Sequence, residues 1–403
     1  MRGDAAGPSL AVDYAPVREA LAERSATAFV HVGTSEDVVL RYLARATELD
    51  GELAVCVTPE QSMLFAPDAP DAAREAFPGD QVLPGGASIP TGERVAVALE
   101  DLGREGTVLA PRTIPHDAAL YLEGRGFEVA STPVVEDARV AKTDPERLQQ
   151  RTVQAAADAA VERARAVLRE SERHGGGDGH GHGGGRGRGR SHGEAEGAGV
   201  DDGVDAVDDH LVFEGMALTT ERLRREVAAS LASSGVDPGV VAVGAGGDAT
   251  PRSDAAIRPG EPVVIALAPR DRDGYHGRVV RTLVVDGDGG WTRRAQLAAD
   301  GGVNAALAEL EPGVDLAAVE REGAAELTAY GFDDPVDAFD VHGVGLDGRE
   351  RPLGGDEAVP EGAVVALDGT ATGPDGVVRV ADLAVVTDDG AERLGTAART
   401  LEP

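Results

Sequence analysis

The chain has 403 residues and a net charge of −33, from 71 acidic and 38 basic side chains. A chain of this length can bury the cores of two domains. The charge disfavours binding to nucleic acid or to anionic membranes, and no apolar run approaches the ~18 residues that a membrane span needs. The first residues contain no apolar core of a secretory signal, so we expect a soluble, cytoplasmic protein.

The composition also bears on the protein's environment. Apolar residues make up 42% of the chain, and the acids are interspersed among them, as in a folded protein. Lys142 is the only lysine, and arginine supplies the other basic groups. An acidic surface poor in lysine is typical of halophilic proteins, because salt screens charge repulsion. The single cysteine, Cys56, excludes a disulfide framework, and we expect a buried, inert thiol.

The first third of the chain alternates apolar runs with helical patterns. The runs predict strands over residues 28–32, 53–57, 95–99, 107–109 and 127–129. Helical spacing occurs within residues 14–49, where Ser35 is a plausible N-cap, and again over residues 118–123. Strands that alternate with helices predict an α/β domain, which we assign to residues 1–140.

One long helix is predicted from Asp144, as its cap, to about Glu172, with Pro145 in the first turn. After it, residues 174–210 begin with a stretch rich in His, Gly and Arg that cannot bury a core, which predicts a disordered insertion. Four of the nine histidines lie in this stretch, residues 174–199: His174, His180, His182 and His192. A solvated linker is the preferred interpretation. Metal storage by these imidazoles is a distant alternative, which deletion of residues 175–199 would test.

The rest of the chain, residues 141–403, predicts an α+β domain. A helix is expected over residues 218–230, capped by Thr219 or Thr220, followed by a strand over 240–243. A hairpin follows over residues 261–282. Helices are expected over 295–310 and 316–330, and strands over 363–367 and 377–386.

Five sequence blocks stand in a distinctive order along this second region. They are ARVAKTDPE (138–146), IRPGEPVVI (257–265), GY with RT (274–282), HGVGL with Glu350 and Pro352 (342–352), and GVVRVADL (376–383). In this order and spacing they resemble the pita-bread metallohydrolases, the family of methionine aminopeptidase, prolidase, Xaa-Pro aminopeptidase and creatinase. The resemblance implies a creatinase-like α/β N-terminal domain and an α+β pita-bread C-terminal domain, whose antiparallel sheet is flanked by helices.

The resemblance also implies a catalytic centre of two divalent ions (Mn, Co or Zn) that activate a bridging water. Five side chains hold these ions in the family. The two aspartates fall on Ala266 and Arg278, and the last glutamate falls on Ala381. Only His342, and Asp368 at the first glutamate position, keep a metal donor. Two accessory histidines fall on Arg252 and Arg349.

Arg278 is the decisive change, because a permanently charged guanidinium repels a divalent ion. We therefore predict that the two-metal site is lost. We hypothesise that Arg278, with Arg252 or Arg349, fills the site and pairs with Asp368, Asp382 or Glu350, since a buried arginine needs such partners. The alternative is that these arginines are solvent-exposed. Without companions, His342 is interpreted as a hydrogen-bonded structural histidine in preference to a metal ligand. The remaining candidates to line the cleft are Tyr275, His276, Glu350 and Asp382.

The resemblance implies a peptidase or amidohydrolase that acts near an N-terminus or a proline bond, usually as a homodimer. The missing ligands favour a family member without metal catalysis or cofactor. Such a protein would bind a peptide-like or small amide ligand, or act as a regulatory pseudoenzyme beside an active paralogue. The alternative is an active Xaa-Pro aminopeptidase-like hydrolase with an atypical metal site.

Overall fold

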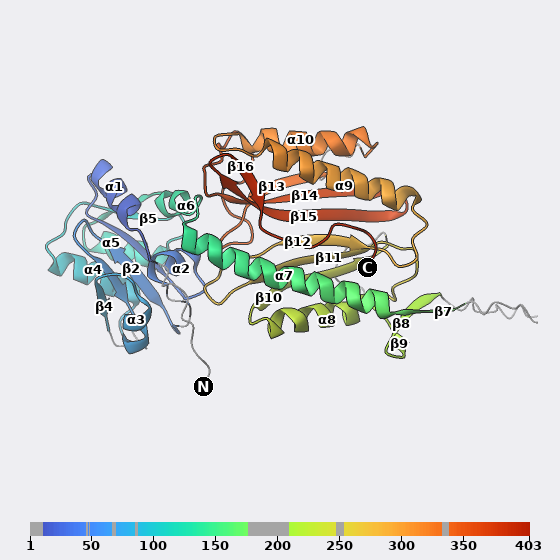
Figure 1. Ribbon diagram of the computed structural model, residues 1–403. Coiled ribbons are helices and arrows are strands. Elements are labelled where there is room, and N and C mark those ends of the chain that lie inside the picture. The colour runs from blue at the N-terminus through green and yellow to red at the C-terminus, as the bar shows by residue number, and fades with distance from the viewer. Residues whose placement is uncertain are drawn as a thin grey trace, which may run out of the picture.

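The structure, a computed structural model, describes residues 11–45, 47, 49–66, 70–84, 88–175, 209–246, 254–332 and 338–403. Two β-sheets form the centres of two layered halves. The long helix α7 (Asp144–Glu170) begins beside the N-terminal half and crosses the C-terminal sheet (Figure 1). The expected α/β layers followed by an α+β region are confirmed.

The N-terminal half is a mixed six-stranded sheet covered by helices. Its strands are β1 (Ala28–Gly33), β2 (Leu53–Val57), β3 (Ser62–Phe65), β4 (Gln81–Leu83), β5 (Thr107–Ala110) and β6 (Glu128–Ser131). Its helices are α1 (Ala15–Glu23), α2 (Val38–Ala44), α3 (Pro70–Ala76), α4 (Thr91–Asp101), α5 (His116–Gly124) and α6 (Val134–Ala138). The strand order is β4-β3-β2-β1-β5-β6. Cys56 is buried in β2 as a free thiol, as predicted, and burial raises its pKa to about 12.

Three local predictions made from the sequence were wrong. Residues 95–99 lie in α4, because Val95 and Leu99 are spaced to share one helical face, where both are fully buried. In the sequence alone, such a short apolar run is compatible with either a helix or a strand. Asp37, and not Ser35, caps α2, since its carboxylate accepts the N–H groups of the first turn. Thr143, and not Asp144, is the N-cap of α7.

The C-terminal half is an antiparallel sheet with two pairs of helices. Its strands are β10 (Asp237–Ala245), β11 (Val263–Arg270), β12 (Val279–Leu283), β13 (Phe339–Gly343), β14 (Val364–Gly373), β15 (Gly376–Thr387) and β16 (Gly390–Arg393). Its further helices are α8 (Thr220–Ser233), α9 (Gly290–Glu309) and α10 (Leu316–Ala329). The strand order is β10-β11-β12-β15-β14-β13, with β16 paired to β15. No helix in the described ranges is long and apolar enough to cross a membrane.

Helices cover one face of this sheet. Ile265 and Leu267 of β11 pack into a core with α7 and α8, while Val365 and Leu367 of β14 pack into a second core with α9 and α10. Figure 1 shows α7 and α9 lying across the strands. Because side chains alternate along a strand, the residues between these core positions point to the opposite face. We call that opposite face the site face.

The ends of the predicted insertion are paired with each other. β7 (Glu172–His174) and β8 (His210–Phe213) form an antiparallel pair, which β9 (Met216–Ala217) extends. His174 stands opposite His210 in the register, with ring centroids 5.2 Å apart. Residues 176–208, which include the other three histidines of the stretch, lie outside the described residues.

Candidate functional site

One row of residues crosses the site face through five strands. The register pairs Ala266 with Val280, Val280 with Ala381, Ala381 with Asp368, and Asp368 with Asp340. Three of the predicted metal-ligand positions, Ala266, Ala381 and Asp368, therefore stand in line. His342 lies two residues from Asp340 on β13 and so shares its face. The sheet does bring the predicted ligand positions together.

Two arginines meet at the single carboxylate of this row. Arg278 precedes Val280 by two residues, and Arg379 precedes Ala381 by two, so in antiparallel strands they flank the row from opposite sides. Nη2 of Arg278 donates to Oδ2 of Asp368 at 2.6 Å, and Nη2 of Arg379 donates to the same oxygen at 2.8 Å. Asp368 is 2% exposed, so its charge is neutralised by the two guanidinium groups.

The positions of the first aspartate and the last glutamate are apolar. Ala266 and Ala381 form a small cluster with Val264 and Val280, and three of these four side chains are buried. Methyl groups supply no donor for a metal ion and exclude water from this side of the row.

His342 is buried and engaged with its surroundings. Nδ1 lies 3.0 Å from the carbonyl oxygen of Gly343, and Nε2 lies 3.7 Å from Oδ2 of Asp340. Burial and the nearby charge of Arg278 lower the pKa of His342, against the effect of the Gly343 carbonyl. This agrees with the interpretation of a structural histidine. Arg349 donates two hydrogen bonds to Asp340, at 2.6 and 3.0 Å.

These residues do not fit a two-metal centre. Of the five positions, two carry methyl groups, one carries a guanidinium, and the carboxylate of Asp368 is occupied by two arginines. Across the described ranges of the chain, no three His, Cys, Asp or Glu side chains are placed to hold a metal ion together. The donor set also lacks the paired bridging carboxylates that bring two cations close together.

The hypothesis about arginine partners was correct for Arg278 and wrong for Arg349, which pairs with Asp340 instead of Asp368, Asp382 or Glu350. Arg252 lies outside the described residues. The other two carboxylates belong to separate ion clusters.

Asp382 lies on the helix-covered face, so it cannot line a cleft on the site face. It is 1% exposed and is held by Arg281, Arg393 and Arg399. Arg281 uses all five of its N–H donors, on Asp382 and on four backbone carbonyls. Although burial opposes ionisation, the charges of Arg281, Arg399 and Arg393 hold the pKa of Asp382 below its usual value.

Glu350 and Lys142 form a second buried cluster, close to where the two halves of the chain meet. Nζ of Lys142 donates to Oε1 of Glu350 at 2.7 Å and to the carbonyls of Arg139 and Val140 at 2.8 and 3.2 Å. Arg139 pairs with the other carboxylate oxygen of Glu350. Burial opposes the charge of Glu350, but Lys142 and Arg139 hold its pKa below the usual value. The only lysine of the chain thus has three acceptors for its three donors.

Tyr275 is also buried between the two halves. Its side chain packs in the core around α2, its hydroxyl donates to Oε1 of Glu146 at 2.5 Å, and it accepts a bond from Arg45 at 3.1 Å. The cavity beside Tyr275 and Glu350 measures about 10 Å³, which is at the lower limit of the space that one water needs. Tyr275, Glu350 and Asp382 are therefore all buried and paired with neighbouring side chains.

His276 is the remaining cleft candidate. Its backbone N–H donates to the carbonyl of Gly345 at 2.8 Å, while the imidazole Nδ1 is buried and has no partner among the described residues. Burial and the charge of Arg270 lower the pKa of His276.

A comparison with known protein families identifies the family of the chain. The model of metallopeptidase family M24 matches residues 149–388, more than half of the chain. The chain belongs to metallopeptidase family M24. No curated protein matches its sequence.

Solved structures of the pita-bread fold superpose on nearly the whole chain. The prolidase of Pyrococcus furiosus is 18% identical with a TM-score of 0.73, and the match covers 95% of this chain and 100% of that one. The Xaa-Pro dipeptidase of Bacillus anthracis is 17% identical with a TM-score of 0.76, over 96% and 97% of the chains. The N-terminal domain of the FACT complex subunit SPT16 from Cicer arietinum is 15% identical with a TM-score of 0.65, over 96% and 94%. At these identities the likeness shows the fold.

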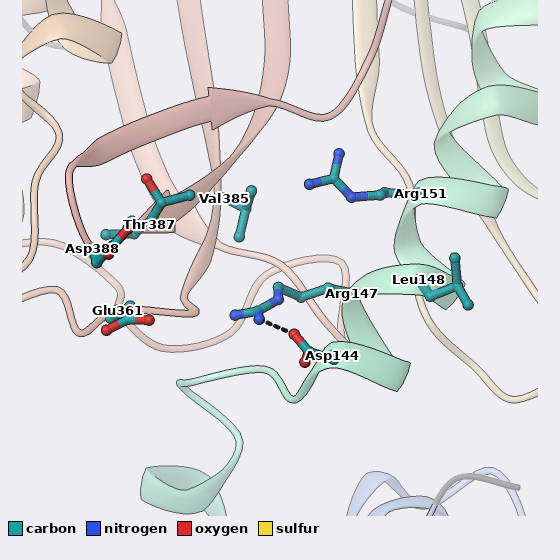
Figure 2. A pocket seen from close by; sticks show the side chains of 9 residues that line it. Asp144, Arg147, Leu148, Arg151, Glu361, Val385, Thr387 and Asp388 are labelled. Atoms are coloured by element: carbon teal, nitrogen blue, oxygen red, sulfur yellow. Dashed lines mark hydrogen bonds and ion pairs between the residues drawn. The ribbon is translucent and has the colours of Figure 1, made fainter. Parts of the chain in front are cut away.

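A surface pocket of about 510 Å³ lies elsewhere on this M24 chain. Its wall comes from the first turns of α7 and from the end of β15 (Figure 2). Arg147 and Arg151 stand in it beside Asp144, Glu361 and Asp388. Arg147 pairs with Asp144 within the pocket, and Arg151 pairs with Glu392 at 3.2 Å. The pocket contains none of the M24 metal positions, and its mixed charges select no ligand class.

Two residues of the site face were missed by sequence reasoning. Arg379 lies in the last sequence block, two residues before Ala381, so strand alternation could have assigned it to the same face. Asp340 lies two residues before His342 and could have been found in the same way.

Proposed function

We propose that this chain is an M24 homologue without two-metal catalysis. It binds a peptide-like or small amide ligand on the site face, or it acts as a regulatory partner of an active paralogue, and it forms a homodimer as is usual for the family. The observation that carries the proposal is the pair of arginines on Asp368, in the space where the family holds its metal ions.

The surrounding scaffold supports the proposal. The buried clusters around Asp382 and Glu350 contain short ion pairs to Arg281 and Lys142. The changes that remove metal donors are concentrated at Ala266, Arg278 and Ala381. A sequence that keeps its structural ion pairs but lacks its metal ligands fits a protein whose fold is still needed while the chemistry is not.

One structural neighbour supports a role other than hydrolysis. It is named as a subunit of the FACT complex, whereas the prolidase and the dipeptidase are named as peptidases. The pita-bread fold therefore also occurs in a protein that is named as a subunit of a complex and not as a peptidase. By analogy of fold alone, a binding or regulatory role is open to this chain.

The proposal includes a salt-rich cytoplasm as the working environment. A net charge of −33 with a single lysine suits such surroundings, because concentrated salt shortens the range of charge repulsion.

The test compares the natural chain with a variant that restores the family's ligands. Both proteins are assayed on Xaa-Pro dipeptides with added Mn²⁺, Co²⁺ or Zn²⁺. The restored variant combines Ala266→Asp, Arg278→Asp, Asp368→Glu and Ala381→Glu. We expect no metal-dependent hydrolysis by the natural chain and a gain of metal binding by the restored variant. Hydrolysis by the natural chain that a chelator abolishes would overturn the proposal in favour of an active enzyme with an atypical metal site.

A further inference from the structure

We propose that Arg278 and Arg379 form a binding site for one small organic anion, a carboxylate or phosphate group, at the centre of the site face. The inference rests on the proposed function, because an anion and a pair of metal ions would compete for the same space. It specifies the part of a ligand that the site face would recognise.

The first argument is the number of unused donors. A guanidinium carries five N–H donors in a fixed plane. The guanidinium groups of Arg278 and Arg379 each donate one hydrogen bond, and both bonds go to Oδ2 of Asp368. No other partner of either guanidinium occurs among the described residues, whereas Arg281, on the helix-covered face of the same sheet, uses all five.

The second argument is access. The side chain of Arg278 is 23% exposed and that of Arg379 is 30% exposed, while Asp368 beneath them is 2% exposed. A ligand that approaches the site face therefore meets guanidinium groups before it meets the carboxylate. Asp368 fixes both arginines in place, so little side-chain entropy is lost when an anion binds.

The third argument is local charge. Two arginines on one carboxylate leave one positive charge, and the neighbouring pair of Arg349 with Asp340 adds none. Because the chain as a whole carries −33, its long-range field repels anions, so this local excess is a specific feature of the site face.

Planar carboxylates and phosphates match this arrangement better than halide ions do. A guanidinium donates two parallel bonds to such a group, and two guanidinium groups can hold it from two sides. The carboxylate of a peptide C-terminus and a phosphate group share this chemistry, so the probes below separate them.

The experiment is calorimetric titration of the full-length chain at one fixed salt concentration. The probes are an N-acetyl dipeptide with a free carboxylate, the same dipeptide as its C-terminal amide, and inorganic phosphate. The variants are Arg278→Gln and Arg379→Gln, each checked for an unchanged circular dichroism spectrum. Arg151→Gln is the matched control, because Arg151 is also partly exposed and paired with a carboxylate, Glu392, but lies outside the site face.

We expect one carboxylate or phosphate to bind per chain and the amide to bind at least about tenfold more weakly. Each site-face variant should weaken binding about tenfold, the effect of losing one charge-assisted hydrogen bond, while Arg151→Gln has no effect. Preference for the dipeptide carboxylate identifies a peptide terminus, and preference for phosphate identifies a phosphorylated ligand. Equal binding by the site-face variants, or no binding of any probe, overturns the inference. If either result is obtained with a natural chain that binds no metal and hydrolyses no dipeptide, only the anion site is refuted and the proposed function stands. Metal-dependent hydrolysis by the natural chain would refute the proposed function itself.

Discussion

Replacement of Asp368 by asparagine tests whether this carboxylate braces the two arginines of the site face. Asn keeps the size of the side chain but removes the charge that pairs with Arg278 and Arg379 at 2.6 and 2.8 Å. A hydrogen bond to a charged group contributes about 1.5–3 kcal/mol. Both arginines are partly exposed and regain some hydration, and the Asn oxygen still accepts one bond. We therefore expect the free energy of unfolding to fall by about 2–3 kcal/mol.

The assay is urea unfolding followed by circular dichroism, for the natural chain, Asp368→Asn and the matched control Asp340→Asn. Asp340 pairs with Arg349 at a similar distance, but their side chains are 44% and 52% exposed, so its loss should cost less than about 1 kcal/mol. In the double variant with Arg278→Gln, the two losses should not add, because they remove the same bond. Equal effects of the two Asn variants would refute the reasoning. Stabilisation of the natural chain by Mn²⁺, absent in Asp368→Asn, would also refute it.

Three further predictions follow from the buried clusters. Lys142→Arg should lower the thermal unfolding midpoint although the charge is kept. The reason is that the planar guanidinium group of arginine cannot reach the three acceptors that surround the ammonium group of Lys142. An unchanged midpoint would contradict this prediction. Tyr275→Phe should reduce the free energy of unfolding in urea by about 1–2 kcal/mol, since the carboxylate of Glu146 loses a buried donor; a smaller loss than for a tyrosine at the surface, such as Tyr330→Phe, would argue against it. Asp382 and Glu350 have pKa values that are lower in the folded chain than in the unfolded chain, where they are about 4. The stability that they contribute is therefore present above about pH 4 and is lost as the pH falls through the folded-state pKa values. Thermal unfolding midpoints should decrease from pH 6 to pH 3, and an increase would contradict this prediction.

Strand alternation explains how much of the site could be read from the sequence. Arg278 and Asp368 meet because both stand on the face opposite the helices, and the family positions were enough to name Asp368 as one of three possible partners. Arg281 follows Arg278 by three residues and so points to the other face, where it meets Asp382. The odd spacing was visible in the sequence, and it should have removed Asp382 from the candidates for the cleft.

Contacts between residues far apart in the sequence could not be predicted in the same way. Tyr275 lies in the hairpin that was expected to flank a cleft, but its partners Arg45 and Glu146 are 230 and 129 residues away. Glu350 is likewise 208 residues from Lys142. No periodicity within one element encodes contacts over such sequence separations, so these residues look like site residues until the tertiary packing is known.

Metal content is the most direct test of the central claim that arginines have replaced the metal ions. The natural chain and a variant without residues 176–199 are dialysed against Mn²⁺, Co²⁺ or Zn²⁺, passed through a desalting column, and analysed by inductively coupled plasma mass spectrometry. The deletion separates ions held by the His-rich segment from ions held by the sheet. We predict well below one ion per chain for the deletion variant. A stoichiometry of two ions per chain in that variant, reduced by Asp368→Asn, would contradict the account.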